Sequence, residues 1–179
     1  MPLAIRLASL ADIPTIQALI TESARGLSAG YYTTPQIESA LAHVFGVDSQ
    51  LILDGTYLVA ETEEQIVGCG GWSKRKPLFG VGRSKSDASD LLLDPTKDPA
   101  RIRAFFVHPK WSRRGIGSLI LQDCETAAQA AGFRRVELAA TLPGEPLYSN
   151  RGYKTAGPFE ISMADGLKLP VFRMEKTFY

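Results

Sequence analysis

The sequence has very few of the residues that build disulfide frameworks or metal sites. Of 179 residues only two are cysteines, Cys69 and Cys124, and two are histidines, His43 and His108. The cysteines form neither a CxxC pair nor a dense pattern, which argues against a disulfide scaffold. The histidines lack metal-ligand spacing. We therefore predict two buried, reduced thiols, no metal and a cytoplasmic location.

An excess of one charge and long apolar runs are also lacking. Lys and Arg number 20 against 19 Asp and Glu, for a net charge of +1. Proteins that neutralise nucleic-acid phosphates usually carry a basic excess, so we expect no nucleic-acid partner. Apolar runs such as residues 91–93 fall far short of the roughly 20 residues of a membrane span. The N-terminal residues show no secretory pattern, and we expect no membrane association.

What remains is typical of a globular protein. Apolar residues make up 45% and charged residues 22% of the chain, and the length is sufficient to bury a core. We predict one domain over residues 1–179. Its expected helices cover residues 13–24, a segment from Thr34 to an end at Gly46, 116–131 and 146–150. Its expected strands cover residues 57–62, 66–72, 104–107, 136–140, 159–163 and 171–177.

This order of elements predicts an α/β or α+β sandwich with a mixed sheet. The first two long strands read as a hairpin, and Asp165-Gly166 predicts a turn between the last two. Three glycines in the second strand, Gly68, Gly70 and Gly71, indicate that something packs closely there. The polar stretch 73–99 is a lid or an insertion. Within it, residues 80–85 lack the spacing of a phosphate loop.

The most informative segment is the predicted strand, turn and helix over residues 103–131. Gly115 and Gly117 flank the start of the helix, where backbone N–H groups lack intrahelical partners and the helix dipole is positive. Arg113 and Arg114 add two full charges. Together they predict a site for a pyrophosphate. Ile120 stands where a dinucleotide fingerprint needs a third glycine, which argues against a nicotinamide cofactor.

Two motifs in this region resemble those of a known family. Val-His-Pro at residues 107–109, followed by Arg-Arg-Gly-Ile-Gly-Ser at 113–118, is similar to the acyl-CoA-binding motif of the Gcn5-related N-acetyltransferases, Gln/Arg-x-x-Gly-x-Gly/Ala. Ser112 departs from the first position of that motif. Residues 131–133, 138–141 and 147–153 resemble the later segment of the family. The specific resemblance covers about residues 103–153.

The resemblance implies an acyl-CoA N-acyltransferase-like fold, with a mixed central sheet of about six to seven strands flanked by about four helices. It implies a sheet splayed between the strand ending near Val107 and the strand at residues 136–141. The pantetheine arm of acetyl-CoA, the co-substrate, would lie in that opening. The cofactor-binding residues implied by position are Phe106, Val107, Arg113, Arg114, Gly115, Ile116, Gly117, Ser118 and Asn150.

The same resemblance implies direct attack of a primary amine on the thioester in a ternary complex. A backbone N–H near Phe106 or Val107 could stabilise the oxyanion, and the phenol of Tyr148 is the predicted catalytic acid. No base is assigned. Glu61, Glu137 and His108 are conceivable, as is a water chain. We expect Glu137 to face outward from its strand and His108 to be a solvated strand end.

The acceptor is the least defined part. A small metabolite, an antibiotic-like compound or a peptide N-terminus would each supply a primary amine. Trp72, Tyr31 and Tyr32 are candidates for its pocket, or simply for packing. The run at residues 74–76 is expected to be a solvated loop face, with contact to the phosphate of the nucleotide as the alternative. The alternative function is a non-catalytic acyl-CoA-binding or sensing domain, and a homodimer is possible.

Overall fold

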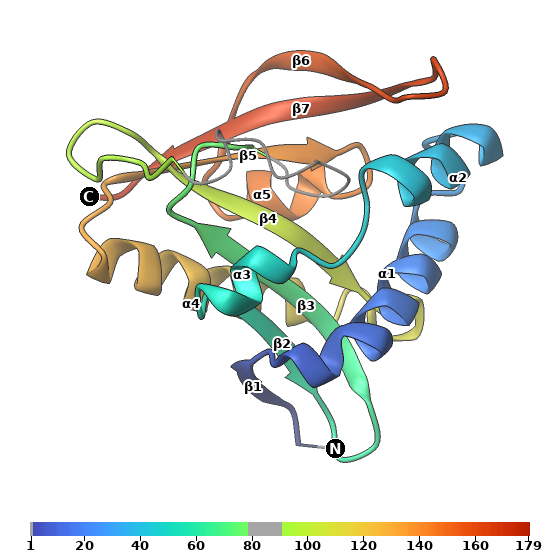
Figure 1. Cartoon of the computed structure of the whole chain (residues 1–179), viewed down its shortest axis with the longest axis horizontal. Coiled ribbons are helices and arrows are strands. Elements are labelled where there is room, and N and C mark those ends of the chain that lie inside the picture. Colours follow the sequence, from blue (N-terminus) through green and yellow to red (C-terminus); the bar gives the residue numbers. More distant parts are fainter. Residues whose placement is uncertain (1, 79–90) are drawn as a thin grey trace.

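The computed structural model describes residues 2–78 and 91–179 (Figure 1). The run at residues 80–85, and with it much of the long polar stretch, lies outside the described residues. Around that gap, Arg75 and Leu92 form an isolated antiparallel bridge.

A seven-stranded sheet organises the chain, in the order β1-β2-β3-β4-β5-β7-β6. The parallel pair is β4 with β5, and the other neighbours are antiparallel, so the expected mixed sheet is confirmed. The strands are β1 (Ala4–Leu7), β2 (Tyr57–Glu61), β3 (Ile66–Ser73), β4 (Ala100–Val107), β5 (Arg135–Thr141), β6 (Lys154–Ser162) and β7 (Lys168–Thr177).

Helices cover both faces of this sheet. The N-terminal helices α1 (Ile13–Leu27), α2 (Thr34–His43) and α3 (Ser49–Leu53) enclose one hydrophobic core. The helices α4 (Ile116–Ala130) and α5 (Glu145–Asn150) enclose the other. Figure 1 shows α1 and α2 together on one side of the sheet, with α4 well separated from them.

The elements missed by sequence reasoning are short. The edge strand β1 has four residues and α3 has five, too few to show a periodicity. The strand β4 begins at Ala100 rather than at residue 104. The helix α2 ends at His43 rather than at Gly46, and the chain continues into α3 through a buried Asp48 that caps it.

A bulge interrupts the pairing of β3 with β4. Phe106 pairs with Cys69, whereas Arg103 pairs with Gly71, so β4 contains an extra residue between the two pairs. Ala104 in this bulge has a φ of 56°, which is rare for a residue with a Cβ. Its carbonyl accepts hydrogen bonds from the Tyr57 hydroxyl at 3.2 Å and from the Cys69 thiol at 3.7 Å. Buried side chains thus hold the strained residue in place.

The sheet opens between β4 and β5 after the first two residues of β4. The strands β4 and β5 pair at Ala100 with Val136 and at Arg101 with Glu137, although both continue for several residues. An ion pair between the side chains of Arg101 and Glu137 joins the last bridged position. The Glu137 carboxylate also accepts from Arg173 of β7, 2.6 Å away. Past this point β4 and β5 diverge, as the resemblance implied.

Two glycines of β3 make room for close packing, Gly68 beneath α4 and Gly70 beneath the ring of Phe105 of β4. A Cβ on Gly68 would lie 2.7 Å from a methyl carbon of Ile116, and one on Gly70 would lie 2.6 Å from the ring of Phe105. Real Cβ atoms do not come so close to other carbons, so these glycines are needed where they stand. The expectation of close packing at β3 is confirmed, and it sets the N-terminal end of α4 beside the open part of the sheet.

Candidate active site

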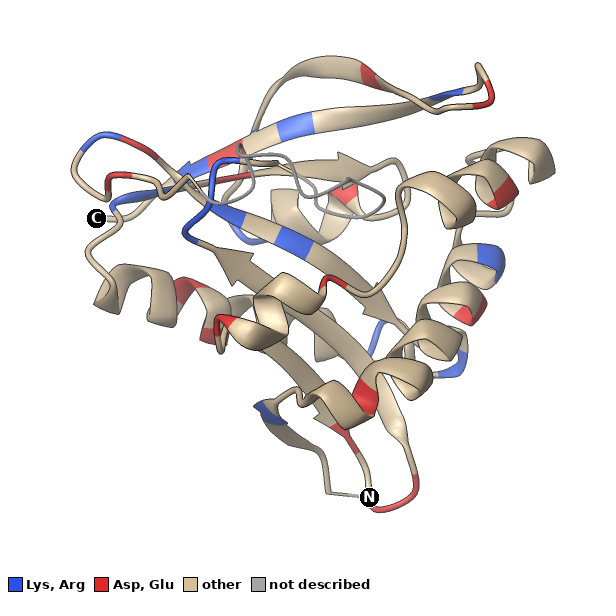
Figure 2. Cartoon of the chain, viewed as in Figure 1, with Lys and Arg blue, Asp and Glu red and all other residues tan. Residues whose placement is uncertain are grey.

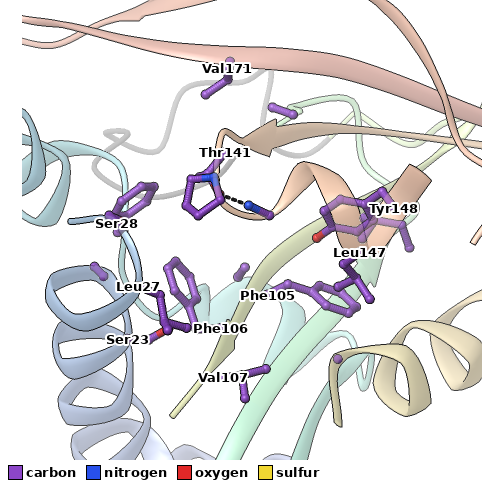
Figure 3. Close-up of a pocket in the computed structure, with 18 of the residues that line it drawn as sticks. Ser23, Leu27, Ser28, Phe105, Phe106, Val107, Thr141, Leu147, Tyr148 and Val171 are labelled. Atoms are coloured by element: carbon purple, nitrogen blue, oxygen red, sulfur yellow. Dashed lines mark hydrogen bonds between the residues drawn. The ribbon is translucent and has the colours of Figure 1, made fainter. Parts of the chain in front are cut away.

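A pocket of about 670 Å³ occupies the opening between β4 and β5 (Figure 3). Its lining comes from the C-terminal half of α1, the segment between α2 and α3, the bulged end of β4, the turn and first residues of α4, the end of β5, and α5 with the segment before it. Residues from β6 and β7 complete the wall on the side of α1. The volume is within the usual range for sites that hold small molecules.

The turn before α4 presents backbone N–H groups to this pocket. Gly115 caps the helix with a φ of 82°, and the first helical hydrogen bond runs from Leu119 N to Gly115 O at 3.0 Å. The N–H groups of the preceding helical residues therefore have no acceptor within the helix. Ile116, Gly117 and Ser118 all line the pocket. This arrangement can bind an anion.

Arg113 completes the turn in a strained conformation. Its φ is 59°, and Ala104 is the other non-glycine residue with a positive φ in the described part of the chain. Both residues line the pocket. Strained backbone of this kind tends to concentrate at functional sites because the surrounding structure must hold it in place. Here both strained residues lie in the wall of the same pocket.

Arg114 lies differently from its neighbour. Its guanidinium carbon stacks 4.8 Å from the ring centroid of Trp111, and the residue is exposed and not part of the pocket wall. A role for Arg114 toward a cofactor stays a prediction. Asn150, at the end of α5, does line the pocket, although its side chain is exposed to solvent.

Tyr148 on α5 stands across the pocket from α1. Its ring packs edge-on against Phe105, with centroids 6.2 Å apart, and against Tyr153 at 5.6 Å. Figure 3 shows its hydroxyl oxygen directed toward the middle of the pocket, and no described residue forms a hydrogen bond with it. Burial raises the pKa of this phenol above its usual value. Tyr148 is therefore a neutral donor with its proton available to a ligand.

The end of β4 presents main-chain groups to the opening. Phe105 packs into the core under α4, while Phe106 turns to the other core and meets Phe45 with ring centroids 5.5 Å apart. Because neighbouring strand residues point to opposite faces, the peptide groups of Phe105, Phe106 and Val107 lie between the two cores. On the side of β5, no strand of the described residues pairs with these groups.

None of the three candidate bases lines the pocket. Glu61 accepts hydrogen bonds from Arg6 at the far edge of the sheet. The prediction that Glu137 faces outward is wrong: it is 4% exposed, because arginines from both neighbouring strands neutralise it. His108 is not a solvated strand end either. Its Nε2 lies 2.9 Å from Glu22 of α1, and its side chain is only 14% exposed.

The three aromatic residues predicted as candidates for the acceptor pocket lie in different parts of the structure. Trp72 packs against Phe133 in the core under α4, away from the pocket. The hydroxyl of Tyr32 donates to Pro170 O at 2.6 Å and accepts from Leu142 N at 2.9 Å. It ties together the segment after α1, the end of β5 and the start of β7. Tyr31 lines the pocket and is 55% exposed.

Sequence reasoning missed a buried ion pair in the pocket wall. Arg103 Nη1 donates to Asp48 Oδ2 at 2.9 Å, and both residues line the pocket. The two lie 55 positions apart, and nothing in the sequence around either residue signals the other.

The run at residues 74–76 is not simply a solvated loop face, because Arg75 forms a bidentate pair with Asp54 at 2.7 and 2.8 Å. This pair holds the pKa of the Asp54 carboxyl below its usual range.

A comparison with protein families decides the classification. The model of the acetyltransferase (GNAT) domain matches residues 53–155. The chain belongs to the GNAT acetyltransferase family. The match runs from the end of α3 through α5, and so includes the open part of the sheet, the glycine turn and Tyr148. No curated protein matches at a significant level.

Solved GNAT structures share the fold over nearly the whole chain. A GCN5-related N-acetyltransferase from Rhodopseudomonas palustris superposes with a TM-score of 0.73 at 22% identity, covering 99% of this chain and 97% of that one. The PaiA N-acetyltransferase from Thermoplasma acidophilum, solved in complex with coenzyme A, gives 0.66 at 16% identity, with coverages of 99% and 100%. A ribosomal-protein-alanine N-acetyltransferase from Brucella melitensis gives 0.63 at 17%, with coverages of 98% and 99%.

Other kinds of site are not evident in the part of this GNAT chain that the structure describes. Residues 2–78 and 91–179 contain no group of His, Cys, Asp and Glu placed to hold a metal ion. Within the same ranges, no helix is both long and apolar enough to cross a bilayer. Both cysteines are free and buried, as expected. Figure 2 shows acidic and basic residues interspersed along the elements.

Proposed function

We propose that this protein transfers an acetyl group from acetyl-CoA to a primary amine, by direct attack within a ternary complex. One observation carries the proposal. A single pocket joins the free N–H groups of the glycine turn, the unpaired edge of β4 and the buried phenol of Tyr148. The N–H groups suit the diphosphate of the co-substrate, the unpaired edge of β4 suits the amides of its pantetheine arm, and the phenol suits its thioester sulfur.

The diphosphate of the co-substrate would bind at the start of α4. The unpartnered N–H groups there, the helix dipole and the guanidinium of Arg113 all favour negative charge. Gly117 lies beneath Leu147 of α5, and the absence of a side chain at this position lets α5 pack closely against the start of α4, beside the proposed diphosphate site.

The pantetheine arm would add to the free edge of β4. Its amide groups can pair with the peptide groups of Phe106 and Val107, which have no partner on the side of β5. This places the thioester near the bulge at Ala104. A backbone N–H from the same stretch would stabilise the oxyanion that forms when the amine attacks.

Tyr148 would stabilise the leaving group. The amine nitrogen bonds to the carbonyl carbon, the carbon–sulfur bond breaks, and the electron pair stays on sulfur. The proton of the amine passes to water. A thiol has an ordinary pKa of about 8.5, below that of a phenol, and burial widens the difference by raising the pKa of Tyr148. The phenol therefore acts as a hydrogen-bond donor to the developing thiolate rather than surrendering its proton outright.

The test combines binding and turnover. Calorimetric titration with coenzyme A measures the first, and release of free thiol from acetyl-CoA in the presence of a panel of primary amines measures the second. Binding with amine-dependent thiol release supports the proposal. Binding without thiol release from any amine would instead support a non-catalytic acyl-CoA-binding domain, and no binding would overturn both.

A further inference from the structure

The half of the pocket away from the glycine turn has an apolar wall. The side chains that form it come from α1, the segment between α2 and α3, β4, and the final hairpin. They are Leu27, Phe45, Phe106, Ile161, Leu169 and Val171. Figure 3 places Leu27 and Val171 on the opposite side of the cavity from Leu147. With the co-substrate against α4 and α5, this half is left for the amine.

This apolar half contains no uncompensated charge among the described residues that line it. Asp48 is the acidic residue of the wall, and its carboxylate is 2.9 Å from the guanidinium of Arg103. Arg113 lies at the other end, beside the glycine turn. A substrate with several ammonium groups needs a carboxylate for each one it buries, because an unpaired buried charge is costly. The described residues of the wall offer none beyond the paired Asp48.

The same surroundings account for the lack of a base. Transfer of an ammonium group from water to an apolar cavity favours loss of its proton. An amine that enters this half would therefore bind in its neutral, nucleophilic form without a side chain to take the proton. The lining residues of the described chain agree with this, since no free carboxylate or histidine is among them.

Two neutral polar groups are available to orient such an amine. Ser23 and Ser28 of the α1 end line the pocket, and each is 4% exposed. No residue in the described ranges hydrogen-bonds with either hydroxyl. Buried hydroxyls normally find a partner, so these two are suited to a ligand. At the rim, the half-exposed ring of Tyr31 is suited to cover an apolar substrate body.

We propose that the acceptor is a small monoamine on an apolar body, with an aromatic ring or short aliphatic chain and no second charge. This inference rests on the proposed acetyltransferase function. It names the neutral, hydrophobic half of the pocket as the determinant of acceptor choice.

The first experiment compares acceptors by amine-dependent thiol release from acetyl-CoA. Phenethylamine and tryptamine represent the proposed class, spermidine the polycations, and a short peptide with an apolar N-terminal residue the peptide acceptors. We expect kcat/KM for phenethylamine to exceed that for spermidine by about a hundredfold, because a second ammonium group would be buried unpaired. A preference for spermidine or for the peptide overturns the inference.

Two variants test the wall itself. Leu27→Glu adds a carboxylate to the apolar half and is expected to lower kcat/KM for phenethylamine at least about tenfold. The ratio of kcat/KM for phenethylamine to that for spermidine should fall as well. Its control is Leu53→Glu, at a 67% exposed position outside the pocket. Tyr31→Ala should raise the KM for phenethylamine by about threefold to tenfold, with the exposed Tyr179→Ala as its control. In each case the KM for acetyl-CoA should not change.

The outcomes distinguish failure of this inference from failure of the proposed acetyltransferase function. Binding of coenzyme A and acetylation of spermidine, but not of phenethylamine, would retain the acetyltransferase and reject the apolar acceptor. Unchanged selectivity in both variants would reject the wall as its determinant. Absence of thiol release with every amine, despite tight binding of coenzyme A, would remove the proposed function itself.

Discussion

The side chain of Leu147 on α5 lies directly over the Cα of Gly117 on α4: a Cβ at position 117 would stand 3.0 Å from Leu147 Cδ2. That separation is tighter than almost all real contacts of a Cβ, but the neighbouring atom is the flexible end of a side chain. A methyl group is therefore tolerated at this position with a small shift of Leu147, whereas a longer side chain must turn into the pocket.

The variant Gly117→Glu is expected to abolish binding of coenzyme A, since it places both bulk and negative charge against the diphosphate. Gly117→Ala should bind with a modest loss. Calorimetric titration measures both. The control is Leu119→Glu, which adds the same charge to the first turns of α4 at an exposed position outside the pocket. Wild-type affinity in Gly117→Glu would show that the diphosphate binds elsewhere.

Replacement of Tyr148 by phenylalanine removes the proposed donor and keeps the ring packed against Phe105 and Tyr153. We expect kcat to fall about a hundredfold or more, with affinity for coenzyme A nearly unchanged. Steady-state thiol release and calorimetry measure the two quantities. Turnover equal to wild type with the best acceptor would exclude the phenol from the reaction.

The protonation state of Tyr148 sets a limit on the pH profile. The phenol donates only while protonated, and burial raises its pKa above the ordinary value of 10.0. Its contribution is therefore fully present below pH 10 and is lost only as pH rises beyond that value. We expect no fall in kcat between about pH 7 and pH 10. A fall in that interval that Tyr148→Phe eliminates would contradict the raised pKa.

Arg113 combines a positive charge with an unfavourable backbone conformation. A left-handed conformation costs an ordinary residue roughly 1–2 kcal/mol, and glycine avoids this at the expense of about 0.5–1 kcal/mol of chain entropy. In Arg113→Gly the free energy of unfolding should thus stay equal or rise by up to about 1.5 kcal/mol, while affinity for coenzyme A falls. Urea denaturation and calorimetry test this.

The partner variant for that position is Arg113→Lys. It keeps the charge and the strained conformation, so its affinity should remain close to wild type and retain the same dependence on salt concentration. Equal affinity in Arg113→Gly and wild type would mean that the charge at residue 113 does not contact the diphosphate.

Glu137 is expected to matter for stability rather than for chemistry. Its carboxylate is buried between Arg101 and Arg173 at the position where β4 and β5 cease to pair. Glu137→Gln leaves two arginines facing a neutral amide and should lower the free energy of unfolding by about 3 kcal/mol. Glu175→Gln, at the exposed neighbouring position of β7, is the control. Denaturant titration measures the free energy of unfolding of both variants. An equal loss of this free energy in Glu137→Gln and Glu175→Gln would refute the structural role of Glu137.

Local patterns in the sequence predicted much of this structure. Features that depend on contacts between residues far apart in the sequence were not predicted. The helix starting at Ile116 and its glycine turn were predictable because caps, charges and periodicity lie within a few residues of one another. The outward orientation expected for Glu137 followed from strand alternation and was wrong. Two arginines, 36 positions away on either side of it in the sequence, make its burial possible, and no local pattern reports them.

The site residues also fall into those that local motifs predicted and those that they did not. Gly115, Gly117 and Tyr148 were found from motifs, and all three line one pocket. The ion pair of Asp48 with Arg103 was not, because the pairing exists only when α3 and β4 are folded against each other. The helices and the final hairpin were expected to supply an acceptor pocket, but the individual residues of the apolar half share no motif and could not be named from the sequence.

The hydrogen bond that the Cys69 thiol donates to the strained carbonyl of Ala104 bears on the chemistry of the fold. Cys69 pairs with Phe106, one strand from where a thioester would lie. Burial raises the pKa of this thiol to about 12, so almost none is thiolate at neutral pH, and thiolate is the nucleophilic form. The sulfur atom nearest to the bulge of β4 is thus kept in its protonated, weakly nucleophilic form by its surroundings.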